Sequence, residues 1–156
     1  MTNSPDGRQN PRASIATADG SPPALFAYGT LQITAVLETL IGRIPSMTAT
    51  SLAGWRVVRL RERPYPGLVR DTSRAANGLL LSGLTAEEWS LLDRFEDSVY
   101  RLERVTTTDM TDAWVYAWPN EFEDADWILG DFEQTELTSY LTRCASWLER
   151  DRNRQA

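Results

Sequence analysis

The sequence predicts an α+β fold, in which short strands adjoin one another and helices are grouped elsewhere along the chain. Between residues 47 and 84, several short apolar runs follow each other and are separated only by turns containing Gly or Pro. Helical periodicity is found near residues 33–42, after residue 84 and in the last third of the chain. Strands that adjoin without an intervening helix favour an α+β domain over a regular βαβ alternation.

The first 23 residues are rich in Ser, Pro, Gly, Asn and Asp, so residues 1–23 are predicted to be a disordered tail. The fold is expected to begin at Ala24, where the apolar run ALFAYG ends at Gly29. The next segment, ITAVLETLIG, has apolar residues at helical spacing. These patterns predict a strand, a tight loop and a helix in succession.

The middle of the chain is predicted to be mostly β-structure. Strands are expected over residues 51–60, 68–71 and 77–84, with the turn-rich sequence RERPYPG after the first of them. Apolar residues lie on both faces of a later strand, DAWVYAW, which follows the strand candidate LERVTTTD. A strand buried on both faces is typical of a small closed or nearly closed sheet.

The helix after residue 84 has the clearest boundary in the chain. Thr85 and Glu88 have the spacing of a capping box, and Leu84 and Trp89 have that of a hydrophobic staple. Further helices are expected over EDADWILGDF and from Thr135 onward. The predicted domain spans residues 24–150, and residues 151–156 are expected to form a charged tail.

The chain has a formal net charge of −6, and all of its positive charge is arginine scattered along the sequence. Such a charge pattern argues against nucleic acid as a partner. No apolar run approaches the roughly 20 residues that span a bilayer, so no membrane association is expected. Cys144 is the only cysteine and falls on an apolar helical stripe, which predicts a buried structural thiol. The cytoplasm is the simplest location for such a chain.

The absence of histidine and lysine restricts the chemistry of this protein. Without histidine, the chain lacks Ser/His/Asp and Cys/His pairs and histidine-based zinc sites. Without lysine, it cannot form a Schiff base with pyridoxal phosphate, and it lacks the lysine of a phosphate-binding loop. The acidic run EFEDAD lacks the spacing of an EF-hand loop, and we interpret it as a solvated helix start. No metal or cofactor is expected, and proton transfer near neutral pH must be performed by a carboxylate.

Glu96 is the candidate for that carboxylate. At about 100° per residue, the helix after Thr85 has an apolar arc, and Glu96 falls in it between Trp89 and Leu92. Asp93 and Asp97 are expected to point away from this arc. The alternative is that the helix ends near Glu96, so that the carboxylate turns into solvent or pairs with a nearby arginine, namely Arg101 or Arg104.

A second candidate feature is the turn formed by Tyr28, Gly29, Thr30 and Leu31, between the first strand and the helix after it. Glycine lets a ligand approach the backbone closely, and amides at a helix start can hold an anion or a developing oxyanion. The alternative is a plain connection in which Thr30 caps the helix.

Taken together, these segments resemble the γ-glutamylcyclotransferase family in its AIG2-like branch, over about residues 24–118. The resemblance rests on the motifs FAYGTL, PYPGLV, NGLLLSGL, LLDRFED, VYRLERV and WVYAW, in this order. It implies a small mixed β-barrel flanked by helices, with one cavity lined by the turn and by the glutamate. Carried over to this chain, it assigns substrate binding to Tyr28, Gly29, Thr30, Leu31, Tyr100 and Arg101, and the acid/base role to Glu96. Asp97 stands where family members usually have Gly, and the part from Asn120 onward matches no motif.

The resemblance also implies a reaction. The α-amine of a γ-glutamyl amine or peptide attacks its own side-chain carbonyl, which releases 5-oxoproline and the linked amine without any cofactor. The expected partner is therefore a small γ-glutamyl substrate. A non-catalytic relative that binds a small metabolite or a partner's terminus in the same pocket is the alternative. The sequence leaves open the identity of the amine and the oligomeric state.

Overall fold

The computed structural model describes residues 23–156, so the tail predicted for residues 1–23 lies outside the described residues except for Pro23. The five strands are β1 (Ala24–Ala27), β2 (Ser46–Arg59), β3 (Pro66–Ser82), β4 (Arg101–Thr106) and β5 (Asp112–Ala117). The helices are the 3₁₀ turn η2 (Thr30–Gln32), α2 (Thr34–Ile41), α3 (Ala86–Phe95), α4 (Leu129–Thr135) and α5 (Leu137–Gln155).

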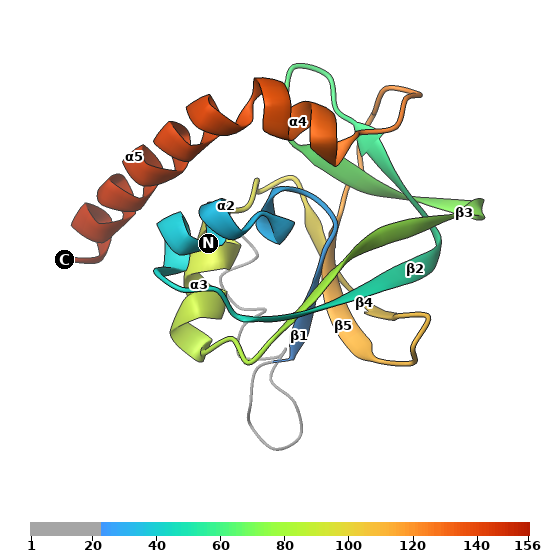
Figure 1. Cartoon of the computed structure of the whole chain (residues 1–156), viewed down its shortest axis with the longest axis horizontal. Helices are drawn as coiled ribbons and strands as arrows, with labels where there is room; N and C mark the ends of the chain where they lie inside the picture. Colours follow the sequence, from blue (N-terminus) through green and yellow to red (C-terminus); the bar gives the residue numbers. More distant parts are fainter. Residues whose placement is uncertain (1–22) are drawn as a thin grey trace, which may run out of the picture.

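The strands form one mixed sheet in the order β2-β3-β1-β5-β4, which confirms the α+β class (Figure 1). Only the β1–β5 pair is parallel, and the other neighbouring pairs are antiparallel. The sheet curls but does not close, so the word barrel describes it only loosely. Its two edges approach each other at one point, where the amide of Thr108 donates to the carbonyl of Ser51 at 3.0 Å.

β3 is one continuous strand, although the sequence predicted two strands within it. It pairs with β2 over the whole length of β2, with a single irregularity between Ala53 and Trp55. Gly54 at this bulge has φ +86, which favours glycine. The polar residues 70–75 are largely exposed on this two-stranded ribbon, and exposed polar residues resemble a turn in the sequence.

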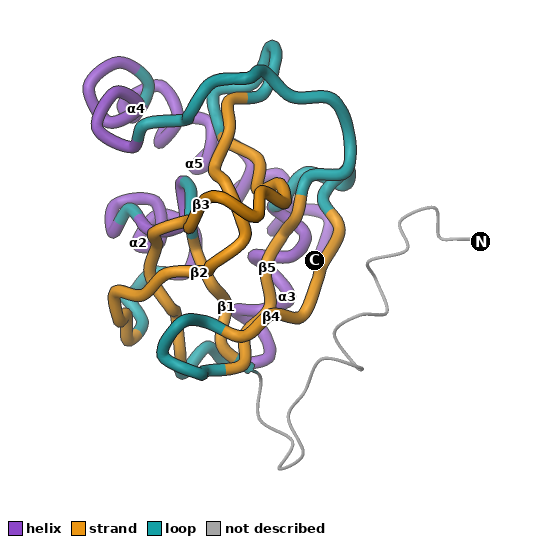
Figure 2. Tube along the Cα trace, turned by 90° about the vertical axis from the view of Figure 1, so that its right-hand side faces the viewer, coloured by secondary structure: helices purple, strands orange, loops and turns teal. Residues whose placement is uncertain are grey.

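The two buried clusters of the molecule lie on opposite faces of β5. Ala113, Val115 and Ala117 belong to one cluster, while Tyr116 belongs to the larger cluster beneath the helices. Figure 2 shows the helices gathered against one side of the curled sheet. The expectation that this strand is buried on both faces is confirmed.

The capping box predicted at the start of α3 is present. The Thr85 hydroxyl accepts a bond from the Glu88 amide at 3.1 Å, and the Glu88 carboxylate accepts one from the Thr85 amide at 2.9 Å. The expectation that Asp93 points away is wrong, because this side of α3 packs against β5. Asp93 is buried, and its carboxylate accepts a hydrogen bond from Tyr116 at 2.6 Å.

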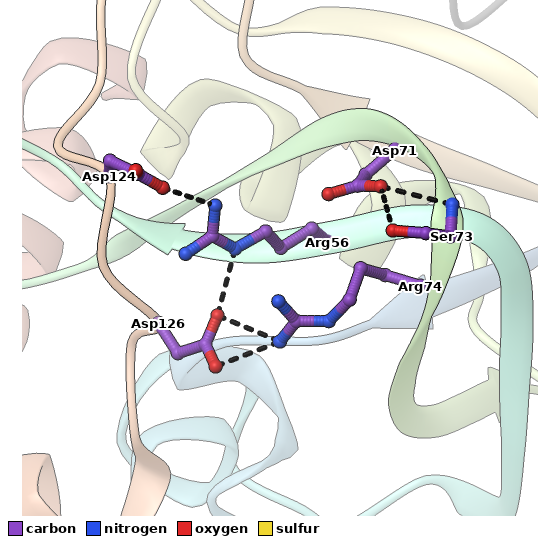
Figure 3. Close-up of polar contacts among 6 residues, drawn as sticks. All are labelled: Arg56, Asp71, Ser73, Arg74, Asp124 and Asp126. Atoms are coloured by element: carbon purple, nitrogen blue, oxygen red, sulfur yellow. Dashed lines mark hydrogen bonds and ion pairs between the residues drawn. The ribbon is translucent and has the colours of Figure 1, made fainter.

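The acidic run after β5 is not a helix start. Residues 123–128 run alongside β2 instead, and the Arg59 amide donates to the Ala125 carbonyl at 2.9 Å. Asp124 and Asp126 each pair with Arg56 at 2.8 Å, and Asp126 also pairs with Arg74 at 2.8 Å (Figure 3). These arginines lie far away in the sequence, so helical periodicity could not reveal the pairing. The helix begins only at Leu129.

The residues expected as a charged tail continue α5 as far as Gln155. Asp151 among them is buried and forms a two-pronged ion pair with Arg94 of α3, at 2.9 and 2.8 Å. This pair ties the end of α5 to α3. In the described part of the chain, no helix is long and apolar enough to cross a membrane.

Candidate active site

A small cavity of about 30 Å³ brings the two predicted features together. The predicted residues that line it are Tyr28, Gly29, Thr30, Leu31, Glu96 and Tyr100. Its wall also includes Tyr65, Pro66 and Tyr116, which the sequence did not single out. The carboxylate and the turn therefore face the same space, although they lie on different elements.

Glu96 reaches the cavity because α3 ends immediately before it. Its backbone is extended, with φ −65 and ψ 146, and its amide donates to the Leu92 carbonyl at 3.0 Å. The prediction that Glu96 lies within the helix is therefore wrong, and the alternative that the helix ends there describes the backbone correctly. The side chain is nevertheless half-buried and lines the cavity, which differs from a carboxylate turned into open solvent.

The turn after β1 is fixed by hydrogen bonds to distant parts of the chain. The Tyr28 hydroxyl donates to the Tyr116 carbonyl at 2.5 Å, and the Tyr28 carbonyl accepts from the Gln32 side chain at 2.8 Å. Thr30 does not cap a helix, because its hydroxyl is bonded to that of Tyr140 at 3.2 Å. The turn is thus held rigidly at the edge of the cavity.

Gly29 is needed for packing. A Cβ atom at this position would lie 2.8 Å from Cγ and 3.0 Å from Cδ of Pro66. The first distance is shorter than real Cβ contacts, and the second is tighter than most of them. The loop can approach the start of β3 this closely only because glycine has no side chain.

Three buried tyrosines surround the carboxylate. Burial raises the pKa of Tyr28, Tyr100 and Tyr140, and the negative charge of Glu96 raises each of them further. These phenols therefore stay protonated near neutral pH and can act as hydrogen-bond donors. Among the residues that line this cavity, Glu96 carries the one carboxylate, so it is the candidate for proton exchange.

Cys144 is close enough to this region for the Glu96 charge to act on it. Burial raises the pKa of its thiol to about 12, and the Glu96 charge adds to this effect. A thiol with such a pKa is not a nucleophile near neutral pH. Its complete burial in the core agrees with the structural role that the sequence predicted.

Tyr100 and Arg101 have different positions although they are adjacent. Tyr100 is buried and its hydroxyl donates to the Pro66 carbonyl, so it fixes the cavity wall. Arg101 is exposed at the start of β4 and does not line the cavity. Successive strand residues point to opposite faces, so only one of these two side chains can face the cavity.

Asp97 does not point away as the sequence suggested; it anchors the loop beside the cavity. Its carboxylate accepts bonds from the Tyr65 hydroxyl at 2.6 Å, the Arg63 side chain at 3.2 Å and the Val99 amide at 2.9 Å. Burial opposes ionisation of Asp97, but these bonds outweigh it and lower its pKa. No local signal links Asp97 to a tyrosine that lies 32 positions earlier.

A second cavity, of about 270 Å³, adjoins the first and shares Tyr65, Glu96 and Tyr100 with it. The rest of its wall consists of Phe95, Asp97, Tyr140, Arg143, Trp147 and Arg150. Four of these residues belong to α5, in the part of the sequence that matched no motif. Within residues 23–156, no three side chains of His, Cys, Asp or Glu gather into a group that could hold a metal ion.

The fold and the cavity define an α+β protein in which one carboxylate and the turn after β1 line a common cavity. Comparison with known proteins is more specific. The family model described as "Gamma-glutamyl cyclotransferase, AIG2-like" matches residues 25–134, and the chain belongs to this family. This confirms the resemblance seen in the sequence.

Two of the similar relatives are plant proteins. AIG2-like protein C of Arabidopsis thaliana is 31% identical over 137 residues, which cover 82% of this chain and 79% of that protein. AIG2-like protein D of the same plant is 28% identical over 136 residues, covering 81% of this chain and 89% of that protein.

Solved structures share the fold. A solution structure from Arabidopsis thaliana matches with a TM-score of 0.60 at 23% identity, over 83% of this chain and 92% of that one. A crystal structure from Pyrococcus horikoshii matches with a TM-score of 0.56 at 19% identity, over 76% of this chain and 96% of that one.

Proposed function

We propose that the protein is a cofactor-independent cyclotransferase that releases 5-oxoproline from a γ-glutamyl amine or γ-glutamyl peptide. The observation that carries this proposal is that Glu96 and the turn of Tyr28 to Leu31 line one cavity, although they are 65 or more positions apart in the sequence. Membership of the cyclotransferase family supports the reaction type.

In the proposed reaction, the α-amine nitrogen of the substrate attacks the γ-carbonyl carbon of the same molecule. The amine arrives largely as an ammonium, so Glu96 first takes a proton from it. The new bond closes the five-membered lactam, and the bond from the carbonyl carbon to the linked nitrogen breaks. The ring nitrogen loses a second proton as this bond breaks. Both protons pass by way of Glu96 to the linked nitrogen, which departs as an ammonium, so the carboxylate ends in its starting state.

The rest of the cavity wall has a positioning role in this proposal. Nucleophile and electrophile belong to one molecule, so the main task of the protein is to hold the substrate folded. We assign the backbone of Gly29 to Leu31 to the substrate carboxylate or to the oxyanion that develops during attack. The phenols of Tyr28 and Tyr100 already donate their protons to backbone carbonyls, so we assign them to fixing the wall.

The size of the cavity adds a requirement. One water molecule needs about 10–15 Å³ of such space, so a cavity of about 30 Å³ holds two or three waters at most, and a glutamyl group needs more room. Tyr65, Glu96 and Tyr100 border both cavities. Because Tyr100 is buried and Glu96 is the proposed base, we assign the opening between the cavities to Tyr65. Productive binding therefore includes a rearrangement at Tyr65.

The variant Glu96→Gln tests the assignment, because it keeps the size of the side chain and removes its basicity. We expect release of 5-oxoproline from γ-glutamyl amides to fall by at least about 10²-fold, while the melting temperature stays close to that of the native protein. Glu87→Gln is the matched control, since Glu87 lies exposed in the first turn of α3, the helix that ends before Glu96. Undiminished turnover in the Glu96 variant would refute the assignment.

The same measurements address the alternative of a non-catalytic binder. A binder would be stabilised thermally by γ-glutamyl compounds, yet neither it nor its variants would release product. An enzyme of the proposed kind shows product with the native protein and with Glu87→Gln only.

A further inference from the structure

The second cavity lies where the departing half of a γ-glutamyl substrate would be. Glu96 borders both cavities, so a glutamyl group in the inner cavity would place its linked nitrogen at this carboxylate. The group attached to that nitrogen then extends into the outer cavity, toward α5. The side chains of α5 therefore contact the amine that is released.

The α5 wall of this cavity carries positive charge. Arg143, Trp147 and Arg150 have the spacing i, i+4 and i+7, which places them on one face of the helix. Across residues 23–156, no carboxylate forms an ion pair with Arg143 or Arg150. By contrast, Arg154 of the same helix has a carboxylate at 3.7 Å.

The acidic groups that face this cavity do not neutralise the two arginines. Asp97 already accepts bonds from Tyr65 and Arg63. Glu96 stands at the boundary with the inner cavity, where the reaction would take place. The outer part of the cavity therefore has an excess of positive charge.

The cavity wall also fixes the position of the Arg143 charge. The Arg143 guanidinium carbon lies 5.6 Å from the ring centre of Tyr65 and 5.8 Å from that of Tyr140, both within cation–π range. Trp147 packs edge-on against Phe95 at 5.1 Å and supplies an apolar surface beside the arginines. A volume of about 270 Å³ is at the lower limit for small-molecule pockets.

We propose that Arg143 and Arg150 bind a carboxylate carried by the released amine, so that the substrates are γ-glutamyl derivatives of small amino acids. Arginine matches the planar geometry of a carboxylate, and the apolar surface of Trp147 suits the short stem that joins the carboxylate to the nitrogen. Neutral or cationic amines lack the group that this subsite binds. This inference rests on the proposed function.

The test compares γ-glutamylglycine with γ-glutamylglycinamide, which differ in the charge of the departing half and hardly in size. We expect the native protein to prefer the carboxylate substrate by about tenfold in kcat/KM, mainly through KM. The double variant Arg143→Gln, Arg150→Gln should lose this preference, because its kcat/KM for the carboxylate substrate falls towards its value for the amide. Arg152→Gln is the matched control, because Arg152 lies on the same helix outside the cavity wall.

An unchanged substrate ratio in the double variant would overturn the inference. A preference that disappears equally in Arg152→Gln would also overturn it, since the effect would then come from the net charge of the helix. If the native protein releases product from neither compound, the proposed function fails. In that case, the dissociation constants of γ-glutamylglycine and γ-glutamylglycinamide, measured by calorimetry, decide the inference. Tighter binding of γ-glutamylglycine by the native protein, lost in the double variant, supports the subsite. Equal affinities of the native protein for the two compounds refute it.

Discussion

The substitution Gly29→Ala is expected to destabilise the protein and to deform the cavity. The added methyl group would lie 2.8 and 3.0 Å from two ring carbons of Pro66. Carbon atoms in contact normally lie about 3.5–4.0 Å apart, so Pro66 must move by roughly 0.5–1 Å. Overpacking of this kind costs about 1–3 kcal/mol of unfolding free energy.

The displacement would also reach the site. Pro66 lines the inner cavity, and its carbonyl accepts the hydrogen bond of the buried Tyr100 hydroxyl. We therefore expect the Gly29→Ala variant to release 5-oxoproline more slowly as well, because the position of Tyr100 depends on Pro66.

Urea denaturation and product release measure the two effects. Gly130→Ala is the matched control, because a Cβ at Gly130 meets no atom within 4 Å and should stabilise the helix by up to about 1 kcal/mol. If the unfolding free energy of Gly29→Ala stays within about 0.5 kcal/mol of the native value, the close approach of this loop to Pro66 is not a feature of the folded protein.

The link between α3 and α5 gives two further predictions. Arg94→Gln leaves the Asp151 carboxylate, whose side chain is 3% exposed, with only the more distant Arg154. Because the Arg94 side chain is itself 34% exposed, we expect a cost of about 1–3 kcal/mol in urea denaturation; a native-like midpoint would contradict this. The bond from Arg94 lowers the pKa of Asp151 in the folded protein. The ionised Asp151 therefore adds its full contribution to the free energy of unfolding above the unfolded pKa of about 4. This contribution is lost as the pH falls through the lower pKa of the folded state. The unfolding free energy of Asp151→Asn should therefore fall less steeply below about pH 4 than that of the native protein, and parallel profiles would exclude this role.

The parts of the fold that depend on neighbouring residues were predictable. The capping box of α3 involves Thr85 and Glu88 only, so its sequence pattern identifies the start of the helix correctly. The two apolar faces of β5 likewise predicted a strand buried on both sides. Glu96 was identified partly for a wrong reason, since it lies after the end of α3.

The parts that depend on long-range contacts were not predictable from local patterns. The acidic residues after β5 resembled a helix start because their partners, Arg56 and Arg74, lie at least 50 positions earlier. Asp97 and Tyr65 support each other across the fold in the same way. The cavity wall on α5 carries no motif, because its arginines acquire a shared role only after α5 has packed beside Glu96.

Crystals of the protein soaked with 5-oxoproline test whether Glu96 and the turn after β1 form the substrate site. We expect the lactam ring in the widened inner cavity, between the Glu96 carboxylate and the backbone of residues 28–31. A ligand seated elsewhere at saturating concentration, for example in the hollow of about 380 Å³ beside Arg56 and Trp127, would contradict it.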